Sequence, residues 1–376
     1  SSKTVSESTT ETVKETTSQS ESTSETKVSG NYSAEDLDTS YSDSDTKIVL
    51  KNTDATITGD GASLKDGNVV ITKAGTYVLS GEFNGSIITD VSDEAVVHIV
   101  LNGVSITNDT SAAINAATGK KVIITLVEGT ENTLSDGSSY TYAAGEDEPD
   151  ATLFVKNDLT INGEGSLTIN SNYDTGIKAK DNLILISGNI TVNSIQKAIK
   201  GSDSVTVENA NIIINAEDDG ITTDGAMVIN GGSIKVEKSG EGLEAVTIDI
   251  NGGDIEIISS DDGINARGVL DDAATDQEKE AYGMQNQADT YFRITGGVVN
   301  VNAQGDGIDS NGDVFIESGY ILVDGPSGNG NGTFDYNGSA YITGGTYIGI
   351  GNGDMKQGFN ENSSLASVDI DYDTNI

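Results

Sequence analysis

The sequence predicts an all-β protein, a right-handed single-stranded parallel β-helix of about ten turns with about 22 residues in each. One observation is an apolar residue that recurs at a nearly constant interval, and another is the short alternating apolar and polar runs between Gly and Asn turns. The repeats also lack a helical period, which argues against leucine-rich and ankyrin solenoids. The repeat is too short for a propeller blade, so a coil of stacked strands remains.

The repeat is clearest in the middle of the chain. A second apolar run begins about eight residues after each recurring apolar residue, and a third run follows a Gly/Asn corner such as "INGG". Three short strands per repeat indicate a coil with three faces, whose inward Ile, Val and Leu side chains form one core. The recurring residues, at intervals of 22, 22, 22 and 21, are Ile177, Ile199, Ile221, Leu243 and Ile264.

The same frame extends to both sides, with insertions near 135–150 and 267–290. The second insertion is rich in helix formers, and it either walls a groove beside the repeats or is a tolerated surface insertion. Residues 1–45 are rich in Ser, Thr and Glu, which predicts a disordered tether before a β-helix domain at 46–376. The outer positions of the frame are Ile88, Ile114, Leu153, Ile308 and Phe334.

The composition limits the possible functions. Sixty Asp and Glu against twenty Lys and Arg give a net charge of −40, which argues against binding to nucleic acid or an anionic membrane. The chain has no cysteine, and its single histidine, His98, argues against a His-rich zinc site or a Ser-His-Asp triad. No apolar run is long enough for a transmembrane helix. We expect a monomer secreted to the surface of a Gram-positive-type cell, with a lipid anchor upstream of Ser1 as one form of attachment.

Acidic residues coincide in the repeat frame. Acids recur two positions before the recurring apolar residue and one position after it, so stacking places them ~4.8 Å apart. Two carboxylates at that distance repel by roughly 0.9 kcal/mol in water and roughly 3.5 kcal/mol at an effective dielectric of about 20. Either Ca²⁺ converts this repulsion into coordination, or the carboxylates splay into solvent. The predicted Ca²⁺ ligands are Asp218, Asp219, Glu241, Glu244, Asp261, Asp262, Asp306, Asp309 and Asp335.

Basic residues cluster in the two turns before these acids. They either pair with neighbouring acids or receive the carboxylate of a uronate sugar. Because tryptophan is absent, a platform for sugar rings would have to be tyrosine, although such tyrosines also pack on solenoid faces. The predicted substrate-binding residues are Lys178, Lys200, Arg267 and Tyr336.

The stretches "DDGITTDG", "DDGINA", "GDGIDSNG" and "GNGTFDYNG", together with the repeated INGG/ITGG corners, carry a resemblance to a known family. The chain resembles secreted bacterial carbohydrate-binding β-helix proteins, best known from cellulolytic clostridia. The resemblance implies a right-handed parallel β-helix that holds calcium and binds plant cell-wall polymers, including acidic sugars such as polygalacturonate, and cellulose. Fold and calcium placement are similar to β-helix pectate lyases, although the family is regarded as non-catalytic. Glu241 departs from the commoner Asp.

Three functions therefore remain open. The first is calcium-dependent, non-catalytic binding of plant cell-wall polysaccharide, with no catalytic residue. The second is a calcium-dependent pectate or polysaccharide lyase, in which Lys200 or Arg267 would be the base that removes the proton beside the uronate carboxyl. The third is an adhesin or spacer without a sugar site.

Overall fold

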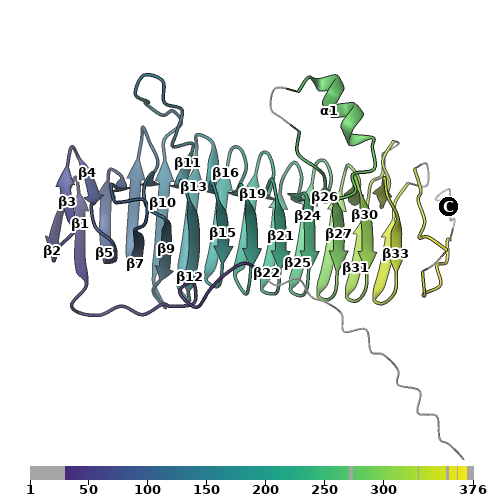
Figure 1. Cartoon of the computed structure of the whole chain (residues 1–376), viewed down its shortest axis with the longest axis horizontal. Helices are drawn as coiled ribbons and strands as arrows, with labels where there is room; N and C mark the ends of the chain where they lie inside the picture. The colour runs from purple at the N-terminus through teal and green to yellow at the C-terminus, as the bar shows by residue number, and fades with distance from the viewer. Residues whose placement is uncertain (1–29, 271–273, 329, 353–354, 362, 371–376) are drawn as a thin grey trace, which may run out of the picture.

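The computed structural model describes residues 30–270, 274–328, 330–352, 355–361 and 363–370. This part of the chain is all-β apart from one helix, α1 (Asp276–Gly283). Its strands lie side by side along the long axis of the molecule (Figure 1). The strand pairs are parallel except at the N-terminal end, where β1 pairs with β2 and β3 pairs with β4 in antiparallel fashion.

The strands form three series, and from β8 onward a strand pairs with the strand three places further along the chain. Series 1 contains β3 (Ala62–Lys65), β4 (Asn68–Ile71), β6 (Ile87–Thr89), β8 (Ile114–Ala116), β11 (Ala151–Val155), β14 (Thr175–Ala179), β17 (Ile199–Gly201), β20 (Ile221–Thr222), β23 (Leu243–Ala245), β26 (Ile264–Ala266), β29 (Ile308–Ser310) and β32 (Asp335–Tyr336).

Series 2 and 3 alternate along the chain. Series 2 contains β9 (Lys121–Leu126), β12 (Asp158–Gly163), β15 (Asn182–Leu185), β18 (Ser204–Val207), β21 (Ala226–Ile229), β24 (Thr247–Ile250), β27 (Tyr291–Ile294), β30 (Asp313–Ile316) and β33 (Ala340–Ile342). Series 3 contains β10 (Glu131–Asp136), β13 (Ser166–Ser171), β16 (Asn189–Ser194), β19 (Asn211–Ala216), β22 (Ser233–Lys238), β25 (Asp254–Ser259), β28 (Val298–Ala303), β31 (Tyr320–Asp324) and β34 (Thr346–Ile350).

The first strands are β1 (Thr46–Asn52), β2 (Asp54–Thr58), β5 (Gly75–Asn84) and β7 (Val96–Asn108). Of these, β5 and β7 are long strands that join series 2 and 3. Strand β7 pairs with β9 through its first half and with β10 through its last residues, so this single strand belongs to both series 2 and series 3. The register between β5 and β7 shifts between Leu79 and Gly81, where the long strands pass from one series to the other.

The pairing confirms the predicted alignment in the centre of the chain. Ile177 pairs with Ile199, Ile199 with Ile221, and the series continues through Leu243 to Ile264. One outer position was wrong: Ile87, not Ile88, pairs with Ile114. Ile87 is fully buried and Ile88 only half-buried, because successive residues of a strand face opposite sides and two adjacent isoleucines cannot both point inward.

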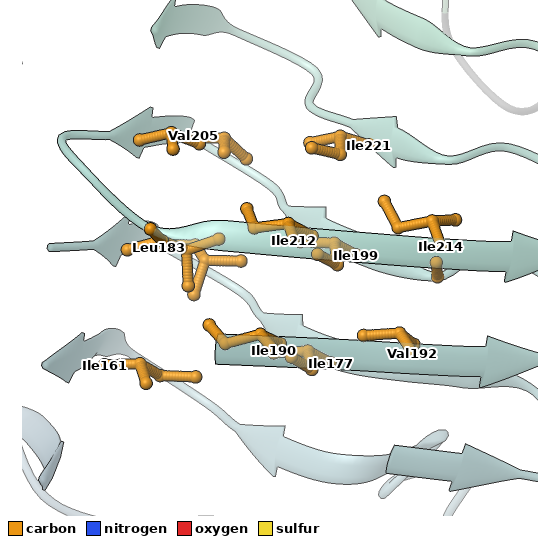
Figure 2. Packing of buried hydrophobic residues seen from close by; sticks show 14 of the residues in the cluster. Ile161, Ile177, Leu183, Ile190, Val192, Ile199, Val205, Ile212, Ile214 and Ile221 are labelled. Carbon is orange, nitrogen blue, oxygen red and sulfur yellow. The ribbon is translucent and has the colours of Figure 1, made fainter. Parts of the chain in front are cut away.

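The inward positions of the three series form one continuous apolar core. Figure 2 shows how Ile177, Ile199 and Ile221 of series 1 lie between the side chains of the other two series. The recurring isoleucines are 0% exposed. Each such burial stabilises the fold by about 1.5–3 kcal/mol, so repetition along the axis supplies the stability that a single turn lacks.

Residues 30–45 lie against the outer side of series 2, although the sequence analysis included them in the tether. Asp36 is fully buried there, and its carboxylate lies 2.7 Å from Lys121 Nζ and accepts a hydrogen bond from Thr160. Asn162 Nδ2 donates to the Asp36 carbonyl at 2.9 Å. These partners compensate the buried charge and fix the segment to β9 and β12. The remaining tether residues, 1–29, lie outside the described residues.

Two further expectations concern single elements. His98 lies on β7, half-buried, with Nε2 2.7 Å from the Thr125 hydroxyl, as expected for a histidine on a strand face. In the described part of the chain no helix is long and apolar enough to cross a membrane.

Both insertions form contacts that hold part of their chain in place. In the first, the Tyr140 ring stacks on Tyr173 with centroids 4.2 Å apart, and its hydroxyl donates to Asp136. The second contains α1, which begins with a capping box. The Thr275 amide donates to Glu278 Oε2 at 2.8 Å, and the backbone amide of Glu278 donates to Thr275 Oγ1 at 3.3 Å.

Candidate functional site

Two columns of acidic positions run along one edge of series 1. In the first column the backbone carbonyls of Asp219, Glu241, Asp262 and Asp306 each accept the amide that lies one turn earlier, at 2.9–3.0 Å. The second column is given by the strand register, in which Thr222, Glu244, Asn265, Asp309 and Asp335 follow one another on successive strands. The predicted stacking of these positions is therefore confirmed.

The first acidic group consists of Asp219, Glu241 and Glu244. One oxygen of each lies within 4.8 Å of the others, and among the described residues this is the one group of three potential ligands with that spacing. Asp219 and Glu244 are only 4% and 7% exposed. The spacing is small enough for one cation to contact all three carboxylates.

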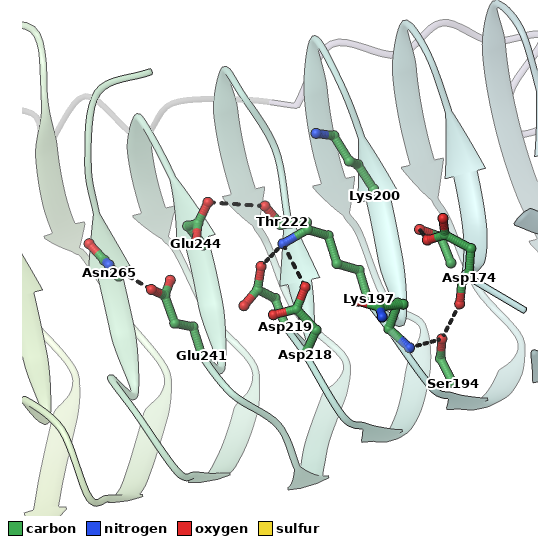
Figure 3. Close-up of polar contacts among 12 residues, drawn as sticks. Asp174, Ser194, Lys197, Lys200, Asp218, Asp219, Thr222, Glu241, Glu244 and Asn265 are labelled. Carbon is green, nitrogen blue, oxygen red and sulfur yellow. Dashed lines mark hydrogen bonds and ion pairs between the residues drawn. The ribbon is translucent and has the colours of Figure 1, made fainter. Parts of the chain in front are cut away.

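Basic side chains from both sides already compensate this first acidic group, and Figure 3 shows the contact on the Lys197 side. Lys197 bonds to Asp219, and its Nζ lies 3.3 Å from Asp218, the predicted ligand at the edge of the column. From the other side, Arg267 Nη2 lies 2.7 Å from Glu244 Oε1. A cation in this group would have to displace Lys197 or Arg267, which lowers its fit to a metal.

The two glutamates of the first acidic group behave as a pair. Burial raises the pKa of Glu241, and its hydrogen bond to Glu244 and the nearby negative charges raise it further. For Glu244 burial also acts to raise the pKa, but the hydrogen bond with Glu241 and the Arg267 charge outweigh burial and lower it. The opposite shifts favour one shared proton within the pair, and Arg267 favours the ionised form of Glu244.

The second acidic group consists of Asp262, Asp306, Asp309 and Asp335, with Asp261 beside it. Burial and mutual repulsion raise the pKa of Asp262 to about 7, that of Asp306 to about 6 and that of Asp309 to about 8. None of the ion pairs formed by described residues includes any of these five aspartates. Their charge is uncompensated by protein cations.

Backbone amides orient the carboxylates of the second acidic group. Asp262 Oδ1 accepts from the Asp306 amide at 2.6 Å, and Asp306 Oδ1 accepts from the Gly332 amide at 2.5 Å. Asp335 Oδ1 accepts from the Tyr336 amide at 2.8 Å. Fixed outer partners of this kind are typical of carboxylates that ligate metals, since they hold one oxygen and leave the other for the ion.

Asn265 lies between the two acidic groups and is only 5% exposed. Its Nδ2 donates to Glu241 Oε1 at 3.1 Å, whereas its Oδ1 has no hydrogen-bond partner among the described residues. Figure 3 shows this oxygen pointing away from Glu241. The next strand places Asp309 beside Asn265. A buried amide oxygen without a donor fits a hard cation. The second acidic group therefore suits Ca²⁺ better in its charge, whereas the first acidic group suits it better in the spacing of its oxygens.

A groove of about 620 Å³ lies over the second column, from which Thr222, Glu244, Asn265 and Asp309 line it. Its floor is formed by outward side chains of series 1, and its wall by residues of the 267–290 insertion, so this insertion does wall a groove beside the acids. The lining residues are Lys197, Lys200, Thr222, Thr223, Asp224, Glu244, Asn265, Arg267, Gly268, Val269, Leu270, Tyr282, Gly283, Asp309 and Asn311.

The structure brings together two of the four predicted substrate-binding residues. Lys200 and Arg267 both line the groove, with Lys200 Nζ 2.9 Å from Asp224. Lys178 is outside the lining and pairs with Asp150. Tyr336 packs its ring on Phe334 and donates its hydroxyl to a backbone carbonyl, so it contributes to the C-terminal end of the core.

The sequence analysis did not select Thr223, Tyr282 or Asn311, which also line the groove. Tyr282 belongs to the insertion, where the repeat gives no register. The one available signal was the position of the insertion directly after Arg267 in the sequence.

These features define an all-β protein of parallel strands with a charged groove along one edge of a sheet. The model of a family described as "Carbohydrate-binding domain-containing protein" matches residues 65–332, more than half of the chain, and the chain belongs to this family.

The chain is similar to a curated protein and to a solved structure. A protein of Acetivibrio thermocellus described as "Carbohydrate-binding domain-containing protein" is 39% identical over 158 residues, which are 41% of this chain and 55% of that protein. The chain thus spans about half the length of the curated relative it matches. A solved structure described as the polysaccharide lyase-like protein from C. thermocellum, as a gadolinium derivative, shares 28% identity. It covers 82% of this chain and 96% of its own, with a TM-score of 0.47.

Proposed function

We propose that this protein binds plant cell-wall polysaccharide at the bacterial cell surface, in a calcium-dependent and non-catalytic manner. Polygalacturonate and related acidic sugars are the proposed ligands, with cellulose as a further one. The observation that supports this best is the groove of about 620 Å³, which is lined by Glu244 and Asp309 of the two acidic groups in a member of a carbohydrate-binding family.

Calcium enters the proposal through the second acidic group. Its aspartates carry uncompensated charge, and Asn265 adds an unpartnered amide oxygen beside them. Ca²⁺ takes about 6–8 oxygen ligands, more than this group supplies with one oxygen from each side chain. The remaining positions would be open to water and to the carboxylate of a uronate residue, which makes the ion a bridge between acidic protein and acidic polymer.

The basic residues of the groove support the same ligand. The Arg267 side chain is 47% exposed. Among the described residues, its guanidinium donates one hydrogen bond, to Glu244. A guanidinium has five N–H donors, so several remain for a uronate carboxylate or for sugar hydroxyls. Lys200 lies three turns before Asn265 in the same column and offers a second positive charge.

The scaffold in this proposal is a right-handed single-stranded parallel β-helix. The three strand series and the spacing of 22 residues between paired isoleucines support it. Such a stack is rigid along its axis, so it presents successive groove positions at a fixed spacing to successive sugars. We further propose that the protein is a secreted monomer held at the surface through its N-terminal region, by a lipid anchor or otherwise.

Calorimetry with oligogalacturonates tests the proposed function. We expect binding with Ca²⁺ and loss of binding with a chelator, with an ion affinity of order 10⁻⁴–10⁻³ M as in other extracellular modules. Asp309→Asn should abolish the calcium effect. Asp254→Asn changes an exposed acid on β25 outside the groove and should leave it intact. Binding that a chelator leaves unchanged would contradict the calcium role, and absence of any glycan binding would favour a spacer.

A lyase is the second candidate, because Lys200 lines the same groove as Asp309. In that reaction the ion would acidify the proton beside the uronate carboxyl, and the Lys200 amine would accept it. Arg267 is the poorer base: burial acts to lower its pKa, but Glu244 and Glu241 raise it overall. Accumulation of unsaturated uronides, read by ultraviolet absorbance and lost in Lys200→Ala, would establish the lyase. No accumulation with Ca²⁺ present supports binding alone.

A further inference from the structure

We propose that Tyr282 forms a stacking subsite for the apolar face of a pyranose ring, so that the 267–290 insertion contributes affinity for neutral and acidic sugars alike. This inference rests on the proposed function and specifies how the same groove recognises a sugar. It assigns to the insertion a role that differs from that of the acidic groups.

The groove has one apolar wall in a chain that is otherwise strongly acidic. Val269, Leu270 and Tyr282 line it, and Val269 is 53% exposed. Met284, two residues after Tyr282, is 72% exposed. Leaving such side chains in water is unfavourable, and neighbouring exposed apolar residues typically mark a binding surface.

The groove floor carries charges that already balance one another. Lys200 pairs with Asp224 at 2.9 Å, and Arg267 pairs with Glu244 at 2.7 Å. Charged groups in such pairs keep donors and acceptors for a ligand without demanding a ligand of opposite charge. Hydroxyl groups fit this floor because each can donate and accept.

The floor and the wall together match the two sides of a sugar. A pyranose ring has hydroxyls around its edge and C–H groups on its face. The edge would meet the ion pairs, and the face would meet the Tyr282 ring, in the manner of aromatic contacts in other ligand sites. This complementarity does not depend on a carboxylate, so the subsite accepts both sugar types.

Tyr282 is held in place before any ligand arrives. Gln287 Nε2 donates to the Tyr282 carbonyl at 3.0 Å, and Gln287 Oε1 accepts from the Gly268 amide at 2.5 Å. From the other side, Asn337 Nδ2 donates to the Gly283 carbonyl at 2.6 Å. A side chain whose backbone is fixed loses less entropy on binding, so its contact yields more affinity.

Gly268 provides the space for this arrangement. A Cβ atom at this position would lie 2.6 Å from the Tyr282 hydroxyl and 2.7 Å from Gln287 Oε1, both of which are too close. The absence of a side chain at Gly268 therefore lets the tyrosine lie directly beside the residues that follow β26.

Three variants test the subsite by calorimetry. Tyr282→Ala should weaken binding of an oligogalacturonate with Ca²⁺, and of a cello-oligosaccharide, by about 3- to 10-fold in each case. Tyr282→Phe keeps the ring and should bind as the wild type does. The matched control is Tyr320→Ala, which removes a half-buried tyrosine of β31 outside the groove and should change neither affinity.

Tyrosine fluorescence supplies a second readout, because the protein contains no tryptophan. Ligand should change the emission of the wild type, and Tyr282→Phe should bind with a smaller change. Wild-type affinity in Tyr282→Ala would overturn the subsite, as would an equal loss in Tyr282→Phe. If the wild type binds no oligosaccharide at all, the proposed function fails; if it binds and Tyr282→Ala has no effect, only the subsite fails.

Discussion

Asn265 marks the border between acids that the chain neutralises and acids that it leaves charged. On one side Lys197 and Arg267 bond to the first acidic group. On the other side the described partners of the aspartates are backbone amides, the Gln357 side-chain amide, which donates to Asp335, and one another, with no cation among them. The unpartnered Oδ1 of Asn265 lies at this border, so a single residue separates a group that is complete in the protein alone from one that an ion would complete.

Replacing one charge in the second acidic group should stabilise the metal-free protein. In Asp262→Asn the new carbonyl oxygen can still accept the Asp306 amide, while the buried charge and its repulsion of Asp306 disappear. At pH 8.5 with a chelator we expect the free energy of unfolding to rise on the order of 1–3 kcal/mol. Thermal and denaturant unfolding would measure it.

The same variant should lose stabilisation by calcium, since one ligand has become neutral. Asp254→Asn is the control and should respond to calcium as the wild type does. A destabilised Asp262→Asn in the chelator would show instead that the charge at 262 supports the fold.

At the residue scale the sequence predicted which acids share a column, but not how each is paired. The interval of 22 residues sets Cα register, and the pairing of Glu244 with Asn265 and of Asn265 with Asp309 confirms that register. The reach of a long side chain across turns is not contained in the interval. Lys197 is one of the basic residues that precede the acids in sequence, and its amine lies against Asp219 of the next turn, which the interval alone does not predict.

At the scale of elements, the insertion that carries α1 should be stable only locally, because few contacts attach it to the strands. Gln287 is 7% exposed and links the Gly268 amide to the Tyr282 carbonyl. In Gln287→Ala we expect faster amide exchange over 274–287, weaker sugar binding by several-fold and an almost unchanged melting temperature. Hydrogen exchange with mass spectrometry would show the first effect.

Gln285→Ala provides the matched control, since Gln285 is exposed and its side chain donates to the Ala281 carbonyl within the helix, a bond that does not reach the strands. It should leave exchange and affinity close to wild type. A large drop in the melting temperature of Gln287→Ala would mean that the insertion is part of the cooperative core.

Elements were predictable where their signals are local. The second insertion is rich in helix formers, and it does contain α1 at Asp276–Gly283. The capping box of this helix lies within four residues of sequence. The segment 30–45 was not predictable, because the partners of Asp36 are 85 and 124 residues away. Composition alone describes such a segment as disordered, whereas Lys121 and Thr160 provide the compensation that orders it.

The whole molecule carries a net charge of −40, so its stability should depend on pH in a direction set by the buried aspartates. In the unfolded chain an aspartate titrates near 3.8, whereas in the folded protein burial and repulsion raise the pKa values of Asp306, Asp262 and Asp309 to about 6, 7 and 8. Between these limits the folded state holds protons that the unfolded state has released. The free energy of unfolding therefore falls as pH rises.

This contribution is complete below about pH 4 and is lost as pH passes through about 8, so the metal-free protein should melt at a lower temperature at pH 8.5 than at pH 5.5. Calcium favours the ionised carboxylates and should reverse the trend, stabilising more at pH 8.5 than at pH 5.5. Thermal unfolding at both pH values, at constant ionic strength and with calcium or chelator, measures both effects. Magnesium at equal concentration controls for screening. A melting temperature that rises with pH in the chelator would contradict the raised pKa values of these aspartates, on which the proposed calcium site depends.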